Sequence, residues 1–344
     1  MKVLIFKVNK LGDNVVFVPV IQAIRRYRPD WRILFFTNSL AEPLYGPPGA
    51  NEKFVIQDRG PFLQAWQQPS QLMSLLKIVR DFKPDRCLFA SDQGNTAYFL
   101  GLLSGAQTRV GRKREFHRVP GAITRPQPFD PSGSEALDGW KLLLRLAENT
   151  DGPKLPDLPP VPNLDHLKTS ASEAPDTIVI YAGASAEFQR WPLNSFVELA
   201  NRLSRDFQVC WIKESRSGAS GLDPGVQLID TPALSDLITV LAGARLFIGN
   251  NSGPFQLASA LGTPSIIING PSSRRWDPFW FPERFRMLRD ESVPCLPCEA
   301  YYSECQNPHR MQCMEKWTAD AVEAEARTWL NAMDSLLPKP KHES

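Results

Sequence analysis

The sequence predicts an α/β protein with two parallel-sheet domains, and three observations support that prediction. Short apolar runs alternate with amphipathic helical patterns in both halves of the chain. A proline-rich polar stretch separates the halves, and 344 residues suffice for two domains of ordinary size. Hydrophobic residues make up 42% and charged residues 22%, as in globular proteins, and the net charge of +2 argues against general nucleic-acid binding.

In the first half, a strand, a turn and a helix follow one another from the amino terminus. Residues 9–14 read as a polar turn, and Pro19 marks the start of the following helix or a kink in it. Residues 72–81 also show helical spacing. The strands of this half are expected at residues 3–8, 33–37 and 86–90. This alternation predicts a parallel sheet with helices on both faces.

The pattern breaks between Pro120 and Pro175, apart from a helix expected at 134–147, and then restarts. The expected later strands are 177–182, 208–213, 246–249 and 265–269, and the expected helices are 193–205, 234–244 and 254–261. Thr318 can cap a last helix that runs to about residue 337, before a tail expected to be disordered. The expected segments are an amino-terminal domain at 1–165, a second domain at 166–317 and a carboxyl-terminal segment at 318–344.

The chain shows no targeting or membrane-spanning pattern. Lys7 interrupts the first apolar run, unlike a signal peptide, and no run approaches the roughly 20 residues that cross a bilayer. A cytoplasmic location is therefore expected, with peripheral contact to the inner face of the plasma membrane left open.

Two turns in the second half favour a phosphate site. In the stretch 248–271, Asn251, Ser252 and Gly253 offer backbone N–H groups, and Pro254 suits the first turn of a helix. Such N–H groups lack internal partners and attract anions. In the second turn, GASAEFQRWP at 183–192, small residues permit close approach and Arg190 can reach a phosphate. The alternatives are a plain tight turn and an ordinary loop.

Asp13 follows the first strand, where a doubly wound fold exposes catalytic groups. The alternative is a helix cap or a turn residue. This turn lacks the G-x-G-x-x-G pattern, which disfavours a dinucleotide-binding dehydrogenase.

Two further clusters are candidate sites. The basic segment 109–118, RVGRKREFHR, is suited to an anionic acceptor or to anionic lipids, and the alternative is a solvated charged loop. Four cysteines, Cys295, Cys298, Cys305 and Cys313, suit a structural zinc or iron ion, and the alternative is reduced thiols in an irregular segment.

Taken in order, these segments resemble the ADP-heptose:lipopolysaccharide heptosyltransferases, glycosyltransferase family 9. The matching residues are Leu11–Asp13, Arg109–Gly111, Gly183–Ser185, Arg190–Pro192, Asn250–Pro264 and Gly270–Pro271. The resemblance implies GT-B architecture, with two Rossmann-like domains facing a cleft. It implies an inverting, metal-independent transfer from a nucleotide-diphosphate sugar, ADP-heptose or a relative, to a lipopolysaccharide-core or other surface-glycan acceptor. No cofactor is required for that transfer.

The resemblance also implies roles for single residues. Asp13 is the catalytic base, in place of the cap that its position alone favours. The amino-terminal domain holds an anionic glycolipid or glycan acceptor, through Lys7, Lys10, Arg109, Arg112, Lys113 and Arg114. The second domain holds the donor, through Gly183, Ala184, Ser185, Gln189, Arg190, Asn251, Ser252, Gly253, Pro254 and Gln256.

The chain departs from the family pattern at several of these positions. Asn251 stands where an acid is usual, Gln256 where a histidine is frequent, and Lys7 where arginine is usual. Gln189 and Arg190 precede Trp-Pro where a lysine is usual. Two alternatives therefore stay open: a non-catalytic GT-B protein that binds sugar nucleotides or glycans, and a sugar-nucleotide epimerase, which needs no acceptor site.

Overall fold

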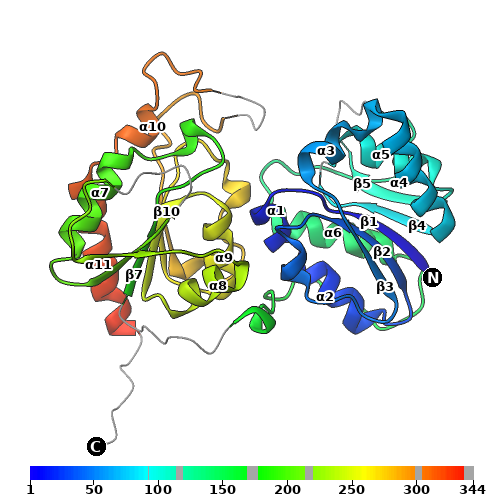
Figure 1. Cartoon of the computed structure of the whole chain (residues 1–344), viewed down its shortest axis with the longest axis horizontal. Coiled ribbons are helices and arrows are strands. Elements are labelled where there is room, and N and C mark those ends of the chain that lie inside the picture. The colour runs from blue at the N-terminus through cyan, green and yellow to red at the C-terminus, as the bar shows by residue number, and fades with distance from the viewer. Residues whose placement is uncertain (92, 114–118, 169–176, 214–219, 299–303, 337–344) are drawn as a thin grey trace, which may run out of the picture. The chain divides into compact units, whose positions relative to one another are not determined.

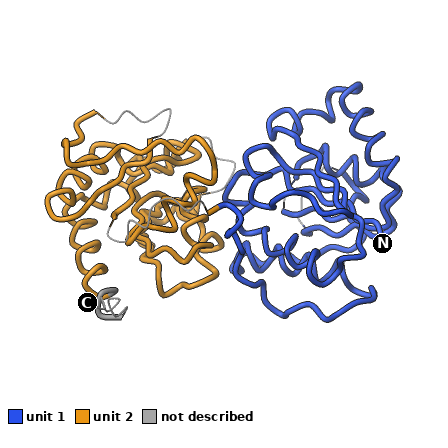
Figure 2. Tube along the Cα trace, turned by 60° about the horizontal axis from the view of Figure 1, so that its bottom comes forward, with its two compact units in different colours: residues 1–167 blue, residues 168–344 orange. Residues whose placement is uncertain are grey.

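The computed structural model describes residues 1–91, 93–113, 119–168, 177–213, 220–298 and 304–336. The chain divides into two compact units, residues 1–167 and 168–344 (Figure 2). Each unit contains one six-stranded sheet in which every neighbouring pair of strands is parallel. In the described ranges, no helix is both long enough and apolar enough to cross a membrane.

The sheet of unit 1 has the order β3-β2-β1-β4-β5-β6. Its strands are β1 (Lys2–Phe6), β2 (Arg32–Thr37), β3 (Glu52–Ile56), β4 (Arg86–Phe89), β5 (Thr108–Arg112) and β6 (Arg125–Gln127). Its α-helices are α1 (Leu11–Val15), α2 (Val18–Tyr27), α3 (Arg59–Gln64), α4 (Pro69–Phe82), α5 (Gly94–Leu103) and α6 (Glu135–Ala147). Helices α3, α4 and α5 cover one face, and α2 and α6 cover the other (Figure 1).

Side chains along β1 point alternately to the two faces of this sheet. Leu4 and Phe6 belong to the core that also contains residues of α4 and α5. Successive side chains of a strand point to opposite faces, so Val3 and Ile5 face α2 and α6. Lys7 follows β1 with the same parity as Val3 and Ile5, and its side chain is as deeply buried as theirs.

The sheet of unit 2 has the order β12-β11-β10-β7-β8-β9. Its strands are β7 (Thr177–Tyr181), β8 (Gln208–Ile212), β9 (Val226–Ile229), β10 (Leu246–Asn250), β11 (Ser265–Ile268) and β12 (Phe285–Leu288). Its α-helices are α7 (Leu193–Leu203), α8 (Leu234–Gly243), α9 (Gly253–Leu261), α10 (Gln312–Glu315) and α11 (Ala319–Leu336). Helices α7 and α11 cover one face, and α8 and α9 cover the other (Figure 1).

Several local predictions hold and others need correction. Ser134 caps α6, because its hydroxyl accepts a hydrogen bond from the backbone N–H of Ala136. Residues 9–14 are not merely a turn, since α1 begins at Leu11. The basic segment 109–118 begins inside strand β5 and is therefore not simply a loop. The last helix contributes Val322 and Ala326 to the core of unit 2, so it packs as part of that unit.

In both sheets the strand order reverses beside the strand that comes first in the chain. The reversal lies between β1 and β4 in unit 1, and between β7 and β10 in unit 2. Ligand sites of open parallel sheets form at the carboxyl ends of strands at this point. The segments after these four strands are therefore the places to look for a site.

Gly249 lies in β10, directly before one of these segments, and has no room for a side chain. A Cβ atom there would lie 2.9 Å from the carbonyl oxygen of Tyr181 and 2.9 Å from the ring of Phe247. We expect Gly249→Ala to lower the free energy of unfolding by about 1–3 kcal/mol, since overpacking a core forces backbone shifts. Urea unfolding measures this loss. Gly225→Ala, where the nearest atom lies at 3.6 Å, is the matched control, and equal effects of both substitutions would contradict the prediction.

Candidate functional site

Asp13 lies in the first turn of α1, directly after β1. The residue at the cap position is Lys10, and its side chain makes no capping bond. Among the residues that the structure describes, none donates a hydrogen bond to the Asp13 carboxylate or forms an ion pair with it. The helix-cap alternative for Asp13 is therefore wrong, because Lys10 occupies the cap position.

The charges around Asp13 come from four elements of unit 1. Burial raises the pKa of the Asp13 carboxyl most strongly, the Lys7 ammonium opposes that rise, and Glu135 adds to it. The more distant cations Lys10 and Arg59 also lower this pKa. The net result is a raised pKa, which suits a carboxylate that has to accept a proton.

Lys7 does not reach the surface. Its side chain is 1% exposed, and its Nζ donates a hydrogen bond of 3.0 Å to Oγ of Ser91. Oγ of Ser91 in turn donates a bond of 2.9 Å to Oε1 of Glu135. Lys7 is thus a buried cation whose charge acts on Asp13, and the acceptor contact predicted for it stays a prediction.

The turn that carries Asp13 is fixed by polar side chains that the sequence reasoning did not single out. Asn14 donates from Nδ2 to the carbonyl oxygens of Asn9 and Lys10 at 3.0 and 2.8 Å, and its Oδ1 accepts from the Tyr45 hydroxyl at 2.7 Å. Gln93, after β4, accepts from the N–H of Val8 at 2.8 Å. Polar residues directly after β1 and β4 were the available signal, because parallel strands end at the same edge.

The basic segment contributes fewer free cations than predicted. Arg109 donates to the carbonyl oxygens of Ala106, Gly121 and Ala122 at 2.5, 3.0 and 2.9 Å. Arg112 is 4% exposed, and its Nη2 lies 2.7 Å from Oε1 of Glu135 and 3.4 Å from Oδ2 of Asp138. Both arginines thus have intramolecular partners, and the acceptor role predicted for them stays a prediction. The side chain of Lys113 is exposed, whereas Arg114 lies outside the described residues.

In unit 2, Asn250 joins the two turns that the sequence indicated. Its Oδ1 accepts a 2.9 Å bond from the N–H of Trp191, and its Nδ2 donates to the carbonyl oxygens of Ala182 and Gly183 at 2.9 and 3.3 Å. Asn250 ends β10 and is fully buried. The segment after β7 and the segment after β10 are thus held against each other at the point where the strand order reverses.

The amino terminus of α9 offers unused hydrogen-bond donors. Ser252 is the N-cap residue but its hydroxyl makes no capping bond, and Gly253 and Pro254 begin the helix. Within the described chain, Oγ of Ser252 and Nδ2 of Asn251 have no hydrogen-bond partner. Free N–H groups, a free hydroxyl and the positive end of a helix dipole together suit a phosphate.

The other predicted donor residues differ in their access to this turn. Nη2 of Arg190 donates to the carbonyl oxygen of Ala184 at 3.1 Å, which holds this cation along the loop after β7. Gln189 is half-buried, and Ser185 is exposed. Gln256 is 5% exposed, and its Nε2 donates a 3.0 Å bond to the carbonyl oxygen of Trp276. Gln256 therefore holds a neighbouring segment, and its predicted contact with the donor stays a prediction.

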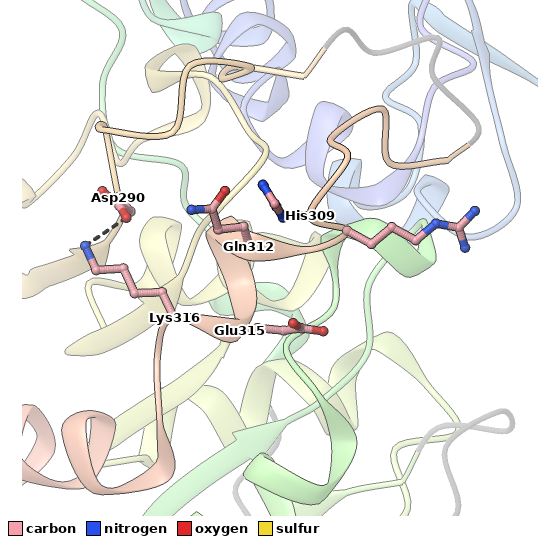
Figure 3. A pocket seen from close by; sticks show the side chains of 6 residues that line it. Asp290, His309, Gln312, Glu315 and Lys316 are labelled. Atoms are coloured by element: carbon pink, nitrogen blue, oxygen red, sulfur yellow. Dashed lines mark ion pairs between the residues drawn. The ribbon is translucent and has the colours of Figure 1, made fainter.

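A pocket of about 730 Å³ lies elsewhere in unit 2, after β12 and around α10 (Figure 3). Its lining residues are Asp290, His309, Arg310, Gln312, Glu315 and Lys316. Oδ2 of Asp290 lies 2.8 Å from Nζ of Lys316, an ion pair that lowers the pKa of Asp290 to about 2. The pocket contains none of the predicted donor residues, so it is not the predicted donor site.

The four clustered cysteines do not form a metal site in this structure. Among the described residues, no group of three or more His, Cys, Asp and Glu side chains is placed to hold a metal ion. The thiols have local contacts instead: Sγ of Cys295 accepts from Asn307 at 3.3 Å, and Sγ of Cys305 accepts from the N–H of Met311 at 3.5 Å. The predicted structural zinc or iron ion is therefore not supported.

The family model and the curated relatives agree on one family. The model of glycosyltransferase family 9 (heptosyltransferase) matches residues 98–307, more than half of the chain. Lipopolysaccharide heptosyltransferase 3 of Escherichia coli is 23% identical over 302 residues, which cover 81% of this chain and 85% of that protein.

Two solved structures show the same fold. The E. coli heptosyltransferase WaaC with ADP-2-deoxy-2-fluoro heptose has a TM-score of 0.68 at 17% identity, and the match covers 95% of this chain and 99% of that one. The E. coli ADP-heptose lps heptosyltransferase II has a TM-score of 0.68 at 19% identity, and the match covers 97% and 100% of the two chains. The predicted α/β fold of the GT-B type is confirmed.

The cysteine environments predict an order of reactivity. Cys295 is exposed and Cys313 is buried, and burial raises the pKa of the Cys313 thiol to about 12. We expect iodoacetamide at pH 8 to label Cys295 first and Cys313 last within the cluster, because the thiolate is the reactive form. Peptide mass spectrometry over time gives the order. Equal protection of all four thiols from labelling, lost when a chelator is added, would contradict this account and would support the predicted metal site.

Proposed function

Since the chain belongs to glycosyltransferase family 9, we propose that it transfers a heptose or a related sugar from a nucleotide-diphosphate donor. ADP-heptose or a relative is the proposed donor, and a lipopolysaccharide-core or other anionic surface glycan is the proposed acceptor. The observation that best supports this proposal is the pair of turns that Asn250 joins at the amino terminus of α9. They present hydrogen-bond donors where a diphosphate requires them.

Unit 2 is the proposed donor-binding domain. The diphosphate would lie against the N–H groups at Ser252 and Gly253, with the Ser252 hydroxyl as a further donor. As the bond to the sugar breaks, negative charge grows on the departing diphosphate, and preorganised donors stabilise that charge. Arg190 supplies a cation beside Ala184. Protein groups alone would thus stabilise the charge on the leaving diphosphate, so we propose a transfer that needs no metal ion.

Unit 1 is the proposed acceptor-binding domain, with Asp13 as the catalytic base. Asp13 would take a proton from the acceptor hydroxyl as its oxygen attacks the anomeric carbon, which inverts the configuration there. The transition state is oxocarbenium-like, as in other glycosyl chemistry. Lys10 and Arg59, exposed cations whose charges act on Asp13, together with Lys113, would attract the anionic acceptor. An acceptor anchored in a membrane would bring the protein to the inner face of that membrane.

The non-catalytic alternative has a specific observation in its favour. Asn251 carries no charge at the amino terminus of α9, and the buried Gln256 is engaged with Trp276. Release of the nucleoside diphosphate only when donor and acceptor are both present, with the sugar recovered on the acceptor, separates transfer from binding. Recovery of an epimerised nucleotide sugar without an acceptor would identify an epimerase instead.

Asp13→Asn tests the base. We expect transfer to fall by about 10²- to 10⁴-fold, because the amide keeps the shape of the side chain and cannot accept the proton. Donor affinity measured by calorimetry should stay unchanged, since the proposed donor residues belong to unit 2. Asp81→Asn, a 71% exposed side chain on α4, is the matched control. Wild-type transfer rates in the Asp13 variant would exclude the proposed mechanism.

Asn250→Ala tests the donor site. We expect the loss of three buried hydrogen bonds to lower the free energy of unfolding by about 1–3 kcal/mol and to weaken nucleotide-sugar binding. Asn201→Ala is the matched control in the same unit, because the Asn201 amide also bonds backbone groups, those of Gly221 and Asp223 in the loop before β9. Equal losses of donor affinity in the two variants would show that the effect is general destabilisation.

A further inference from the structure

A chain of buried polar contacts links the end of β1 to α6 through the end of β4. Lys7 donates to Ser91 at 3.0 Å, and Ser91 donates to Glu135 at 2.9 Å. Nη2 of Arg112 forms ion pairs with Oε1 of Glu135 at 2.7 Å and with Oδ2 of Asp138 at 3.4 Å. Each of these side chains is more than nine-tenths buried, so none of them serves as an exposed ligand contact.

The backbone at Ser91 is strained in a way that this chain of contacts explains. Ser91 has φ of 69°, in the left-handed region that favours glycine. Such strain persists where surrounding contacts enforce it, and it is concentrated at functional sites. Here the Ser91 hydroxyl bonds to Lys7 on one side and to Glu135 on the other.

Among the described residues, two buried cations, Lys7 and Arg112, lie among three carboxylates, those of Asp13, Glu135 and Asp138. Arg112 forms ion pairs with Glu135 and Asp138, and Lys7 is the cation that lowers the pKa of Asp13 most. In the described part of the chain, the other charged groups that act on Asp13 are Lys10 and Arg59, which solvent screens, and Asp13 in turn acts on the Tyr45 phenol.

We propose that Ser91, which is itself bonded to Glu135, is a positioning residue that holds a charged Lys7 ammonium near Asp13 and thereby keeps Asp13 ionised when the acceptor arrives. The phenyl ring of Phe17, 5.3 Å from Nζ of Lys7, closes the remaining side of the ammonium. This role rests on the proposed function of Asp13 as the base. It adds a buried support that acts on the reaction through Lys7 without contacting either substrate.

The first experiment is the pH dependence of kcat/KM in Lys7→Met, Ser91→Ala and Ser91→Gly. Removing Lys7 takes an opposite charge from Asp13, so the acid limb of the profile moves to higher pH by about one unit. Both Ser91 variants move it in the same direction, because each removes the hydroxyl that holds the ammonium. Glycine relieves the backbone strain at position 91, whereas alanine does not. If the role of Ser91 were purely structural, the two variants would differ in activity and the acid limb of the pH profile would not shift. Ser104→Ala, which removes another buried serine of unit 1, is the matched control and leaves the limb unchanged.

The second experiment needs no substrate and uses the full chain. The folded state raises the pKa of Asp13, so folding favours its protonated form. The free energy of unfolding of the wild type therefore falls relative to that of Asp13→Asn as pH rises. The fall begins near the pKa of Asp13 in the unfolded chain and ends above its pKa in the folded chain. In the Ser91→Ala and Ser91→Gly backgrounds this loss extends to higher pH.

The two experiments together separate the two proposals. If no donor and acceptor pair gives transfer, the proposed function fails, and the unfolding measurements still decide whether Ser91 acts on Asp13. The positioning role would be overturned if the Asp13-dependent loss of stability covered the same pH range in the wild type and in the Ser91 variants.

Discussion

Both candidate sites depend on one constraint: the first strand of each sheet has later strands on both of its sides, so the strand order reverses beside it. Parallel strands joined by right-handed crossovers pack helices on both faces, and the strand order reverses once in each sheet. The reversal brings the segments after β1 and β4 together in unit 1, and those after β7 and β10 in unit 2. Asp13 and Ser91 come from the first pair, and Gly183 and Ser252 from the second. The same topology, repeated in the two units, therefore positions both the proposed proton-accepting site and the proposed anion-binding site.

The two sites use buried polar groups in different ways. In unit 1 the buried groups are charged, and burying charge is costly unless partners compensate it, so the Arg112 and Lys7 cations lie among carboxylates. In unit 2 the buried link is the neutral amide of Asn250, which satisfies three backbone groups. The unit 1 arrangement adjusts the proton affinity of one carboxylate, whereas the unit 2 arrangement fixes the shape of a turn.

The sequence predicted the fold and the segments that follow the central strands better than it predicted the contacts of each side chain there. Apolar periodicity and two proline-containing turns were enough to find α9 and the segment after β7, because these signals are local. Burial is not local: Lys7 and Gln256 have residue types suited to a ligand, yet the pleat of β1 and the packing of α9 turn them inward. Arg109 was predicted to contact a ligand as part of the basic segment. Its three carbonyl partners lie 3 to 13 residues away and leave no pattern in the sequence, so the sequence did not reveal these bonds. The Ser91 backbone conformation and the Glu135 contact depend on strand order, which one sequence does not display.

Hydrogen–deuterium exchange with and without ADP tests most directly the claim that the reversal between β7 and β10 forms the donor site. The account predicts slower exchange for the backbone amides of residues 182–185 and 251–255 when ADP is bound, with little change after β1 and β4 in unit 1. Binding of ADP that protects unit 1 and leaves both of these turns in unit 2 unchanged would contradict the account.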